Sequence, residues 1–343
     1  MVHFVFNDLT VPVIVAPMAG GPSTPQLCAA ATNSGGLGVV AAGLLSTEAC
    51  AHQAAEVRRL SSGPLAVNLF VPTPVAAIPQ ELEQYAEHLR IDAARFGVEV
   101  GRPRHDTDWQ PKLDMLCDIR PDMVSFTFGL PSPAEVKRLQ AVGASTTATV
   151  TTVAEARIAA AIGVDALVTQ GPEAGGHRGT LDPREQPATE ALPELVAAVT
   201  ASVDIPVVGA GGIATASDVS TILGSGAAAV QLGTAFLLAD EAGTHQVYRA
   251  ALQSDEFSET VVTRSFTGRY ARAIRNRFTD DHSDQAPFGF PEIGFMTAPL
   301  LAAAAEAGDA QGLSLFAGSQ FRRSRPGPVA EIMGRVTDGL CRR

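Results

Sequence analysis

Short runs of apolar, often β-branched residues recur along the first 240 residues and alternate with alanine-rich stretches of helical pattern. Within each run the apolar residues are mostly consecutive, which is typical of parallel strands covered by helices. A closed (β/α)8 TIM barrel contains eight such units, so we predict this fold. The alternative is a doubly wound open α/β sheet. The eight runs lie at residues 13–16, 37–41, 65–70, 123–126, 145–150, 166–169, 206–209 and 228–232.

Two parts of the chain fall outside this alternation. Residues 71–120 are rich in proline and charge, with helical patterns at 81–95 and 110–117, and we interpret them as an insertion after the third strand. Residues 241–343 exceed the eight units and carry helical patterns at 299–307 and 329–340. We therefore expect a barrel over residues 1–240, a smaller lid or substrate domain over 241–320, and a C-terminal return helix within 321–343.

Composition narrows the class of protein. The chain has 343 residues and a formal net charge of -11, which argues against nucleic acid and anionic membrane surfaces as partners. No apolar run approaches the roughly 20 residues that span a bilayer, and no signal peptide is evident. The four cysteines lack CxxC spacing, which fits a reducing cytoplasm without a structural zinc site. We expect a cytoplasmic monomer or homodimer without a bound metal.

The sixth run leads into a loop that reads QGPEAGGHRG at residues 170–179. A double glycine, Gly175 and Gly176, delivers His177, whose imidazole is the side chain that titrates nearest neutrality. Strands of α/β enzymes commonly end in such loops at the active site. His177 is thus a candidate catalytic residue, and the alternative is a tight surface loop with an incidental histidine.

Two further turns resemble phosphate sites. In barrel enzymes the loops after the seventh and eighth strands commonly hold a phosphate on backbone N–H groups. Here the seventh run ends in GAGGI and the eighth in QLGT. Glycine would remove the Cβ obstruction in both turns, and a threonine can add a hydroxyl donor, whereas the alternative is that the glycines only permit tight turns. The residues concerned are Gly211, Gly212, Gln231, Leu232, Gly233 and Thr234.

Amide side chains end two of the strands. Asn68 ends the third run and Gln170 the sixth, so both would face the barrel mouth, where amides can hydrogen-bond a heterocycle. Alternatively, each amide could form hydrogen bonds only with the backbone of nearby loops.

Two charged motifs are weaker candidates for a functional site. DDHSD at residues 280–284 is expected to be a solvated acidic loop rather than a metal site. Five arginines between residues 264 and 277 could attract an anionic ligand, but they are expected to be paired surface residues.

The motifs in this order resemble the nitronate monooxygenases, formerly called 2-nitropropane dioxygenases, and their class I branch in particular. The resemblance rests on APMAGG at 16–21, NSGGLG at 33–38, Asn68, QGPEAGGHRG, GAGGI and QLGTAF, with GRYARAIRNRF at 268–278 and LSLFAGSQ at 313–320. It implies a barrel with a lid that binds FMN non-covalently. It further implies that the flavin takes one electron from an alkyl nitronate, after which O2 reacts and a carbonyl compound and nitrite leave.

The resemblance also assigns roles. Met18 and Asn68 would contact the flavin, Gln170 with Gly175 and Gly176 would lie beside its ring or ribityl chain, and the glycine turns would bind its phosphate. His177 matches the family's active-site histidine, which serves as hydrogen-bond donor to the nitro oxygens or as general base toward a neutral nitroalkane.

The chain departs from the class I pattern in its substrate pocket. Phe290 stands where a tyrosine is expected before a proline, Ala298 stands near an expected lysine, and His105 near another aromatic hydroxyl. A site without its hydroxyl and ammonium should discriminate against a carboxylate-bearing nitronate. We therefore expect a more apolar or larger substrate than propionate 3-nitronate.

Three other functions remain open at this point. The same motifs would suit an NAD(P)H-dependent flavin reductase of the quinone-reductase or enoyl-reductase type. They would also suit a flavin-binding barrel without turnover. A barrel that acts on a phosphorylated sugar or nucleotide would need an acid/base carboxylate pair, and the sequence shows none.

Overall fold

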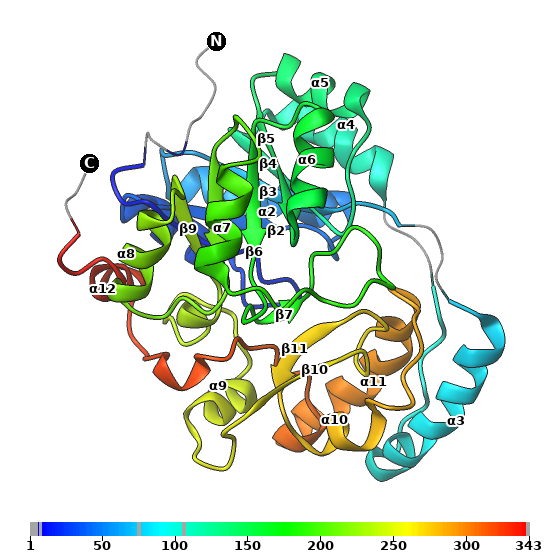
Figure 1. Ribbon diagram of the computed structural model, residues 1–343. Coiled ribbons are helices and arrows are strands. Elements are labelled where there is room, and N and C mark those ends of the chain that lie inside the picture. The colour runs from blue at the N-terminus through cyan, green and yellow to red at the C-terminus, as the bar shows by residue number, and fades with distance from the viewer. Residues whose placement is uncertain (1–5, 7–8, 74–76, 105–107, 341–343) are drawn as a thin grey trace.

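The computed structural model describes residue 6 and residues 9–73, 77–104 and 108–340. Eight parallel strands close a barrel in the order β1-β2-β3-β4-β5-β6-β8-β9 (Figure 1), which confirms the predicted TIM barrel. Pairing of Ile14 in β1 with Gln231 in β9 closes the ring. The barrel strands are β1 Val13–Val15, β2 Leu37–Ala41, β3 Ala66–Phe70, β4 Met123–Thr127, β5 Ser145–Val150, β6 Ala166–Gln170, β8 Val207–Ala210 and β9 Ala229–Leu232.

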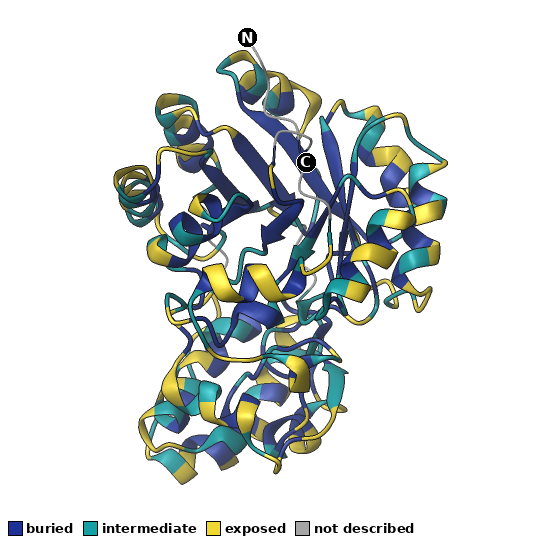
Figure 2. Cartoon of the chain, turned by 90° about the vertical axis from the view of Figure 1, so that its left-hand side faces the viewer, coloured by how far each residue is buried: buried dark blue, intermediate teal, exposed yellow. Residues whose placement is uncertain are grey.

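The strands are apolar throughout because both of their faces are buried. In β1, Ile14 belongs to a cluster contributed by seven of the eight barrel strands, which fills the barrel interior. Its neighbours Val13 and Val15 belong to a second cluster that includes residues of the outer helices. Figure 2 shows the strands as almost continuously buried ribbon, with exposed residues on the outer faces of the helices.

Helices cover the barrel from outside, and several of them begin at a residue whose side chain caps the helix. Ser132 and Glu135 form a capping box at α5, and Thr215 with Asp218 forms another at α8. At α6, Thr152 caps the backbone of Glu155. The helices on the barrel are α1 Pro25–Asn33, α2 Thr47–Leu60, α4 Trp109–Ile119, α5 Pro133–Ala141, α6 Val153–Ala161, α7 Leu192–Thr200, α8 Ala216–Gly224 and α12 Val329–Val336.

A second layer, which we call the lid, lies over the carboxyl ends of the barrel strands (Figure 1). Its centre is a sheet in the order β10-β11-β7, formed by Thr260–Thr263, Ala271–Ile274 and Gly176–His177. Helices α9 Gln246–Gln253, α10 Arg277–His282 and α11 Glu292–Glu306 complete it. Helix α3, Pro79–Phe96, packs against α11, so this part of the insertion joins the lid in space.

The small sheet was not predicted from the sequence, and it corrects one expectation. His177 lies on a two-residue strand that pairs with Ala271 in β11, rather than in an isolated glycine loop. Strands this short carry no detectable period, so only their partners reveal them. No helix among the described residues combines the length and apolar character needed to cross a membrane.

Candidate active site

A cavity of about 720 Å3 lies between the barrel mouth and the lid. Its floor comes from turns that follow the barrel strands, and its roof from the lid segments around Thr267, Phe290 and Ser314. Cavities at the carboxyl ends of barrel strands are the usual place for ligands in this fold, and the volume suits a cofactor together with a small substrate.

The candidate residues from distant parts of the sequence converge on this one cavity. The exception is His105, which falls outside the described residues. The cavity is lined by Met18, Asn68, Gln170, Gly175, Gly176, His177, Gly211, Gly212, Gln231, Leu232, Gly233, Thr234, Phe290 and Ala298.

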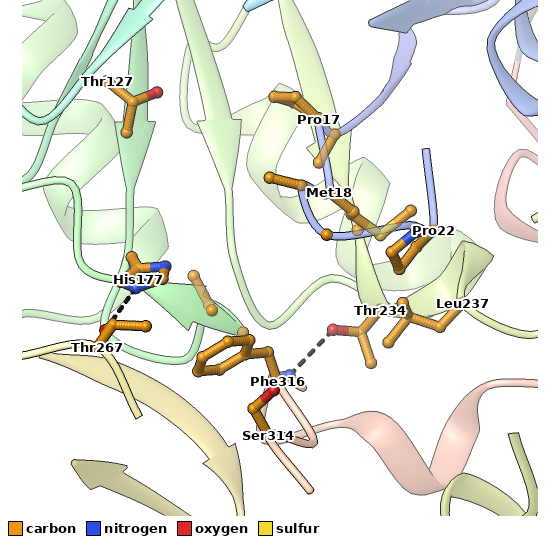
Figure 3. Close-up of a pocket in the computed structure, with 18 of the residues that line it drawn as sticks. Pro17, Met18, Pro22, Thr127, His177, Thr234, Leu237, Thr267, Ser314 and Phe316 are labelled. Carbon is orange, nitrogen blue, oxygen red and sulfur yellow. Dashed lines mark hydrogen bonds between the residues drawn. The ribbon is translucent and has the colours of Figure 1, made fainter. Parts of the chain in front are cut away.

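His177 is fixed in the wall of the cavity by one hydroxyl and several aromatic rings. Its Nε2 lies 2.8 Å from Oγ1 of Thr267, and its other ring nitrogen faces the space toward Met18 (Figure 3). The ring centroids of Phe128, Phe290 and Phe316 lie 5.4, 5.4 and 5.2 Å away. Sequence reasoning missed Thr267 and Phe128, because no local motif marks them, and it assigned no role to Phe316 within LSLFAGSQ.

This environment keeps the imidazole neutral. Burial among the rings is the main cause, and the positive charge of Arg269 adds to it, so that the pKa of His177 falls to about 3. The surface that His177 still exposes faces the cavity, where a ligand would cover it. A neutral imidazole can accept a hydrogen bond at one nitrogen while it donates from the other.

Gln170 holds the segment that carries the histidine. Its Nε2 donates to the carbonyl of His177 at 2.9 Å, and its Oε1 accepts from the N–H of Gly179 at 2.8 Å. Both the donor and the acceptor of the amide therefore bind backbone groups of its own loop, as the alternative interpretation of this residue predicted. Gln170 fixes His177 and offers a bound heterocycle mainly the face of its amide.

Asn68 is held differently. Its Nδ2 donates to the carbonyl and hydroxyl of Ser125, at 3.2 and 2.9 Å, and to Oγ1 of Thr127 at 3.0 Å. Three oxygen partners on one side define the orientation of the amide. The carbonyl oxygen is therefore the atom of Asn68 that can accept a hydrogen bond from a ligand in the cavity.

The glycine turns need glycine for more than one reason. Gly211 and Gly212 have φ angles of +109° and +69°, a region that side chains disfavour. A Cβ on Gly211 would also lie 2.8 Å from Cβ of Ala174. Thr234, at the start of the turn after β9, accepts a hydrogen bond from the N–H of Gly318 at 2.9 Å (Figure 3). Its hydroxyl hydrogen is then available to an anion.

The wall of the cavity is uncharged. Among the described residues that line it, none is Lys, Arg, Asp or Glu. Its polar groups are amides, hydroxyls, imidazoles and backbone. An anion in this cavity would therefore be held by hydrogen bonds rather than by contact with a lysine or arginine side chain.

Two charged motifs differ from expectation. The arginines between residues 264 and 277 are not all on the surface, since Arg269 is 1% exposed. Arg272 donates to the carbonyl of Pro172, and only Arg275 behaves as a surface residue paired with Asp280. His282 in DDHSD is also buried, with Nε2 2.7 Å from Oδ2 of Asp92. The arginines are buried because backbone carbonyls accept their hydrogen bonds. His282 is buried because it binds Asp92, which is 190 residues away in the chain. Neither partner can be recognised from the local sequence.

The sequence and the fold are similar to those of known proteins. A family model described as nitronate monooxygenase matches residues 5–339. A probable nitronate monooxygenase of Staphylococcus aureus (strain Newman) is 33% identical over 335 residues, which cover 96% of this chain and 94% of that protein. The crystal structure of a nitroalkane oxidase from Streptomyces ansochromogenes matches with a TM-score of 0.94 and 41% identity, over 98% and 97% of the two chains.

The chain belongs to the nitronate monooxygenase family. It is accordingly an oxidoreductase, and membership of the family supports nitronate oxidation as its general chemistry. FabK from Thermotoga maritima matches with a TM-score of 0.74 and 24% identity, a likeness that extends to the fold alone.

Proposed function

We propose that the protein is an FMN-dependent monooxygenase that oxidises alkyl nitronates with O2 to carbonyl compounds and nitrite. The observation that carries the proposal is the single cavity in which His177, the two amides and both glycine turns meet. Nitronate monooxygenases are flavoproteins in general, which supports a flavin as cofactor.

The residues present fit FMN. Gly211 and Gly212 form a turn that a Cβ would fill, at the place where barrels bind phosphate on backbone N–H groups. Because the described residues of the wall include no lysine or arginine, the phosphate would be held by backbone and by the hydroxyl of Thr234. Met18 and the Oδ1 of Asn68 would contact the ring system, and Gly175 and Gly176 leave it room.

The chain's own residues orient the substrate. When bound, the flavin supplies the oxidation chemistry. His177 donates a hydrogen bond to a nitro oxygen of the nitronate, because its imidazole stays neutral and keeps one N–H. Thr267 and Gln170 keep the imidazole in place, and the rings of Phe128, Phe290 and Phe316 exclude water from it.

Anaerobic addition of ethyl nitronate to the FMN-loaded protein tests this function. We expect the visible flavin spectrum to change, and nitrite to appear once air is admitted. An unchanged spectrum would contradict the proposal. Anaerobic addition of NADH distinguishes this function from that of an NAD(P)H-dependent flavin reductase. Rapid bleaching of the flavin by NADH would favour the reductase.

We further propose that the substrate has a neutral tail. Phe290 and Ala298 line the cavity and offer neither a hydroxyl nor an ammonium group, and the described wall has no cation near them. A carboxylate tail would therefore lose its water without gaining a partner. We expect butyl nitronate to have a KM at least tenfold below that of propionate 3-nitronate, and equal values would contradict this.

A further inference from the structure

Two buried arginines lie directly behind the uncharged wall of the cavity. Arg178 follows His177 in the chain, and Arg269 comes from the lid just before β11; each is 1% exposed. Arginine is rarely buried so completely without a partner of opposite charge, because moving a cation out of water is costly. The burial of these two arginines behind the cavity therefore needs a physical explanation.

Both guanidinium groups bind backbone carbonyls rather than carboxylates. Arg178 donates to the carbonyls of Gly171 and Gln170, and Arg269 donates to those of Arg178 and Thr180. The ion pairs of the described residues include neither arginine. Nε of Arg178 and Nη1 of Arg269 are buried without any hydrogen-bond partner. Carbonyl dipoles satisfy most of the donors but leave the charges unneutralised.

The charges nearby leave a positive excess. Glu155 is a buried carboxylate whose charge acts on both arginines, and it accepts hydrogen bonds from Thr151 and from the N–H of Leu181. One buried carboxylate thus stands against two buried guanidinium groups. Asp182 and Glu173 also act on these arginines or on Arg272, but both are exposed and screened by water. Burial lowers the pKa of Arg178 and of Arg269 only to about 10, so both stay protonated near neutral pH.

One aromatic ring separates this charge from the ligand space. Cζ of Arg269 lies 4.4 Å from the ring centroid of Phe128, and that ring lies 5.4 Å from the imidazole of His177. The other groups packed on His177, namely Phe290, Phe316 and the hydroxyl of Thr267, carry no charge. Nothing in this layer screens the field as water would.

We propose that Arg178 and Arg269 form a buried cationic pair that attracts the anionic substrate through the uncharged wall of the cavity. The inference rests on the proposed function, since it takes the ligand to be a nitronate, whose charge lies on its nitro oxygens. Neither arginine touches the substrate. The pair supplies the potential, and neutral His177 supplies the hydrogen bond, so that the anion is held without a cation that could form a tight ion pair with it.

Arg269→Met and Arg269→Lys form a matched test, because lysine keeps the charge and loses only the forked geometry. The probes are nitrite, an anion with the same N–O groups, and nitroethane, which is neutral; their dissociation constants are measured on FMN-loaded protein by visible-spectrum titration. We expect Arg269→Met to weaken nitrite about tenfold, as one charge roughly 10 Å away does at an effective dielectric of ~20. Nitroethane should change by less than about twofold, and Arg269→Lys should bind nitrite nearly as the unaltered protein does.

Unchanged nitrite binding by folded Arg269→Met would overturn the proposal. An equal loss in Arg269→Lys would also overturn it, since the geometry and not the charge would then matter. If the proposed function fails instead, ethyl nitronate leaves the flavin spectrum unchanged in the unaltered protein. The nitrite titration remains informative in that case, so the two failures are distinguishable.

A second measurement does not depend on ligand binding. NMR titration of the histidine rings should show one imidazole, identified as His177 by its loss in His177→Gln, that stays neutral down to below pH 5. In Arg269→Met its titration should move to higher pH, because a nearby cation no longer opposes protonation. Titration of His177 near pH 6.5 in the unaltered protein would contradict a positive field at this position.

Discussion

At the scale of single residues, the site is organised around a histidine that its neighbours keep neutral. Thr267 fixes one ring nitrogen, Gln170 fixes the backbone of the same residue, and three phenylalanines remove water from the ring. The result is a hydrogen-bonding group whose protonation is insensitive to pH in the physiological range, unlike that of an ordinary histidine.

His177→Gln should lower kcat/KM for ethyl nitronate about 100-fold, in line with the loss of one positioned hydrogen-bond donor to a charged substrate oxygen. FMN content should stay the same, because Gln170 and the glycine turns remain. The measurement is steady-state nitrite release on protein of known flavin content. Thr267→Val is the matched variant, and we expect a smaller loss because the imidazole stays but its orientation loosens. Full activity of His177→Gln would remove the histidine from the mechanism.

The unaltered enzyme should show no ionisation of His177 between pH 5 and 8. Its folded-state pKa of about 3 means that the neutral form persists throughout that range. The pH profile of kcat/KM for a preformed nitronate, measured in that interval, checks this. A limb with an apparent pKa near 6.5 that disappears in His177→Gln would contradict the neutral assignment.

At the scale of elements, contacts between segments far apart in the chain hold the lid together. Asp92 of α3 accepts a hydrogen bond from His282 of α10, and Arg277 lies 3.7 Å from the same carboxylate. Asp92 is 3% exposed, so its charge depends on these partners. The hydrogen bond from His282 is the main cause that holds the pKa of Asp92 below its ordinary value.

Asp92→Asn should lower the free energy of unfolding by roughly 2 kcal/mol at pH 7, because a buried charged hydrogen bond is lost. Since the folded-state pKa is depressed, the stabilisation by Asp92 is present above the unfolded-state value of 3.8 and is lost as the pH falls through the folded value. The difference in free energy of unfolding between Asp92→Asn and the unaltered protein should therefore shrink on acidification.

Urea unfolding at pH 7 and pH 3.5 measures this difference. Glu87→Gln, which breaks the exposed ion pair with Arg90, is the control. Equal stability of Asp92→Asn at pH 7 would contradict the assignment.

Close backbone packing joins the histidine segment to the C-terminal part of the lid. A Cβ on Gly175 would lie 2.4 Å from the backbone nitrogen of Gly318, so Gly175→Ala must push these segments apart. We expect it to lower the free energy of unfolding by about 1–3 kcal/mol and to weaken FMN binding, as overpacking does. Gly224→Ala is the control, because a Cβ there meets no atom within 4 Å. Thermal melts and FMN titration of both variants measure the effect, and a Gly175→Ala protein like the control would contradict it.

At the scale of the whole molecule, barrel and lid share the segment that carries His177. Strand β7 leaves the barrel after β6 but pairs with β11 of the lid, and the N–H of Arg178 also donates to the carbonyl of Tyr270 at 2.7 Å. The lid therefore cannot separate from the barrel without releasing the histidine. A ligand in the cavity contacts both layers and should stabilise them together.

FMN at 100 times its dissociation constant should raise the free energy of unfolding by about 2.7 kcal/mol, by mass action on the folded state. Because the cavity lies between the two layers, we expect a single melting transition that moves upward as a whole. Calorimetry with and without FMN measures this. Two transitions, of which the lid's is unaffected by FMN, would contradict a shared site.

The sequence by itself determined the barrel, its strand count and the turns that end the strands. These features depend on residues close together in the chain. Both faces of each barrel strand are buried, so the runs are continuously apolar, and each glycine turn is formed within a few residues. The residues that end strands converge at the mouth because parallel strands bring them there. Asn68, His177 and Gly211 are therefore recognisable as candidate site residues from their positions in the sequence alone.

Only the tertiary structure decided what those residues bind and what lies behind them. Thr267 is 90 residues from His177, Asp92 is 190 residues from His282, and the lid strands are too short to carry a period of their own. The sequence predicts Arg269 as a surface residue, and this prediction is wrong. A buried charge needs hydrogen-bond acceptors, and distant segments of the chain supply those of Arg269. The physical reason is that backbone carbonyls and aromatic rings, which every chain contains, gain specificity only when the fold brings them together.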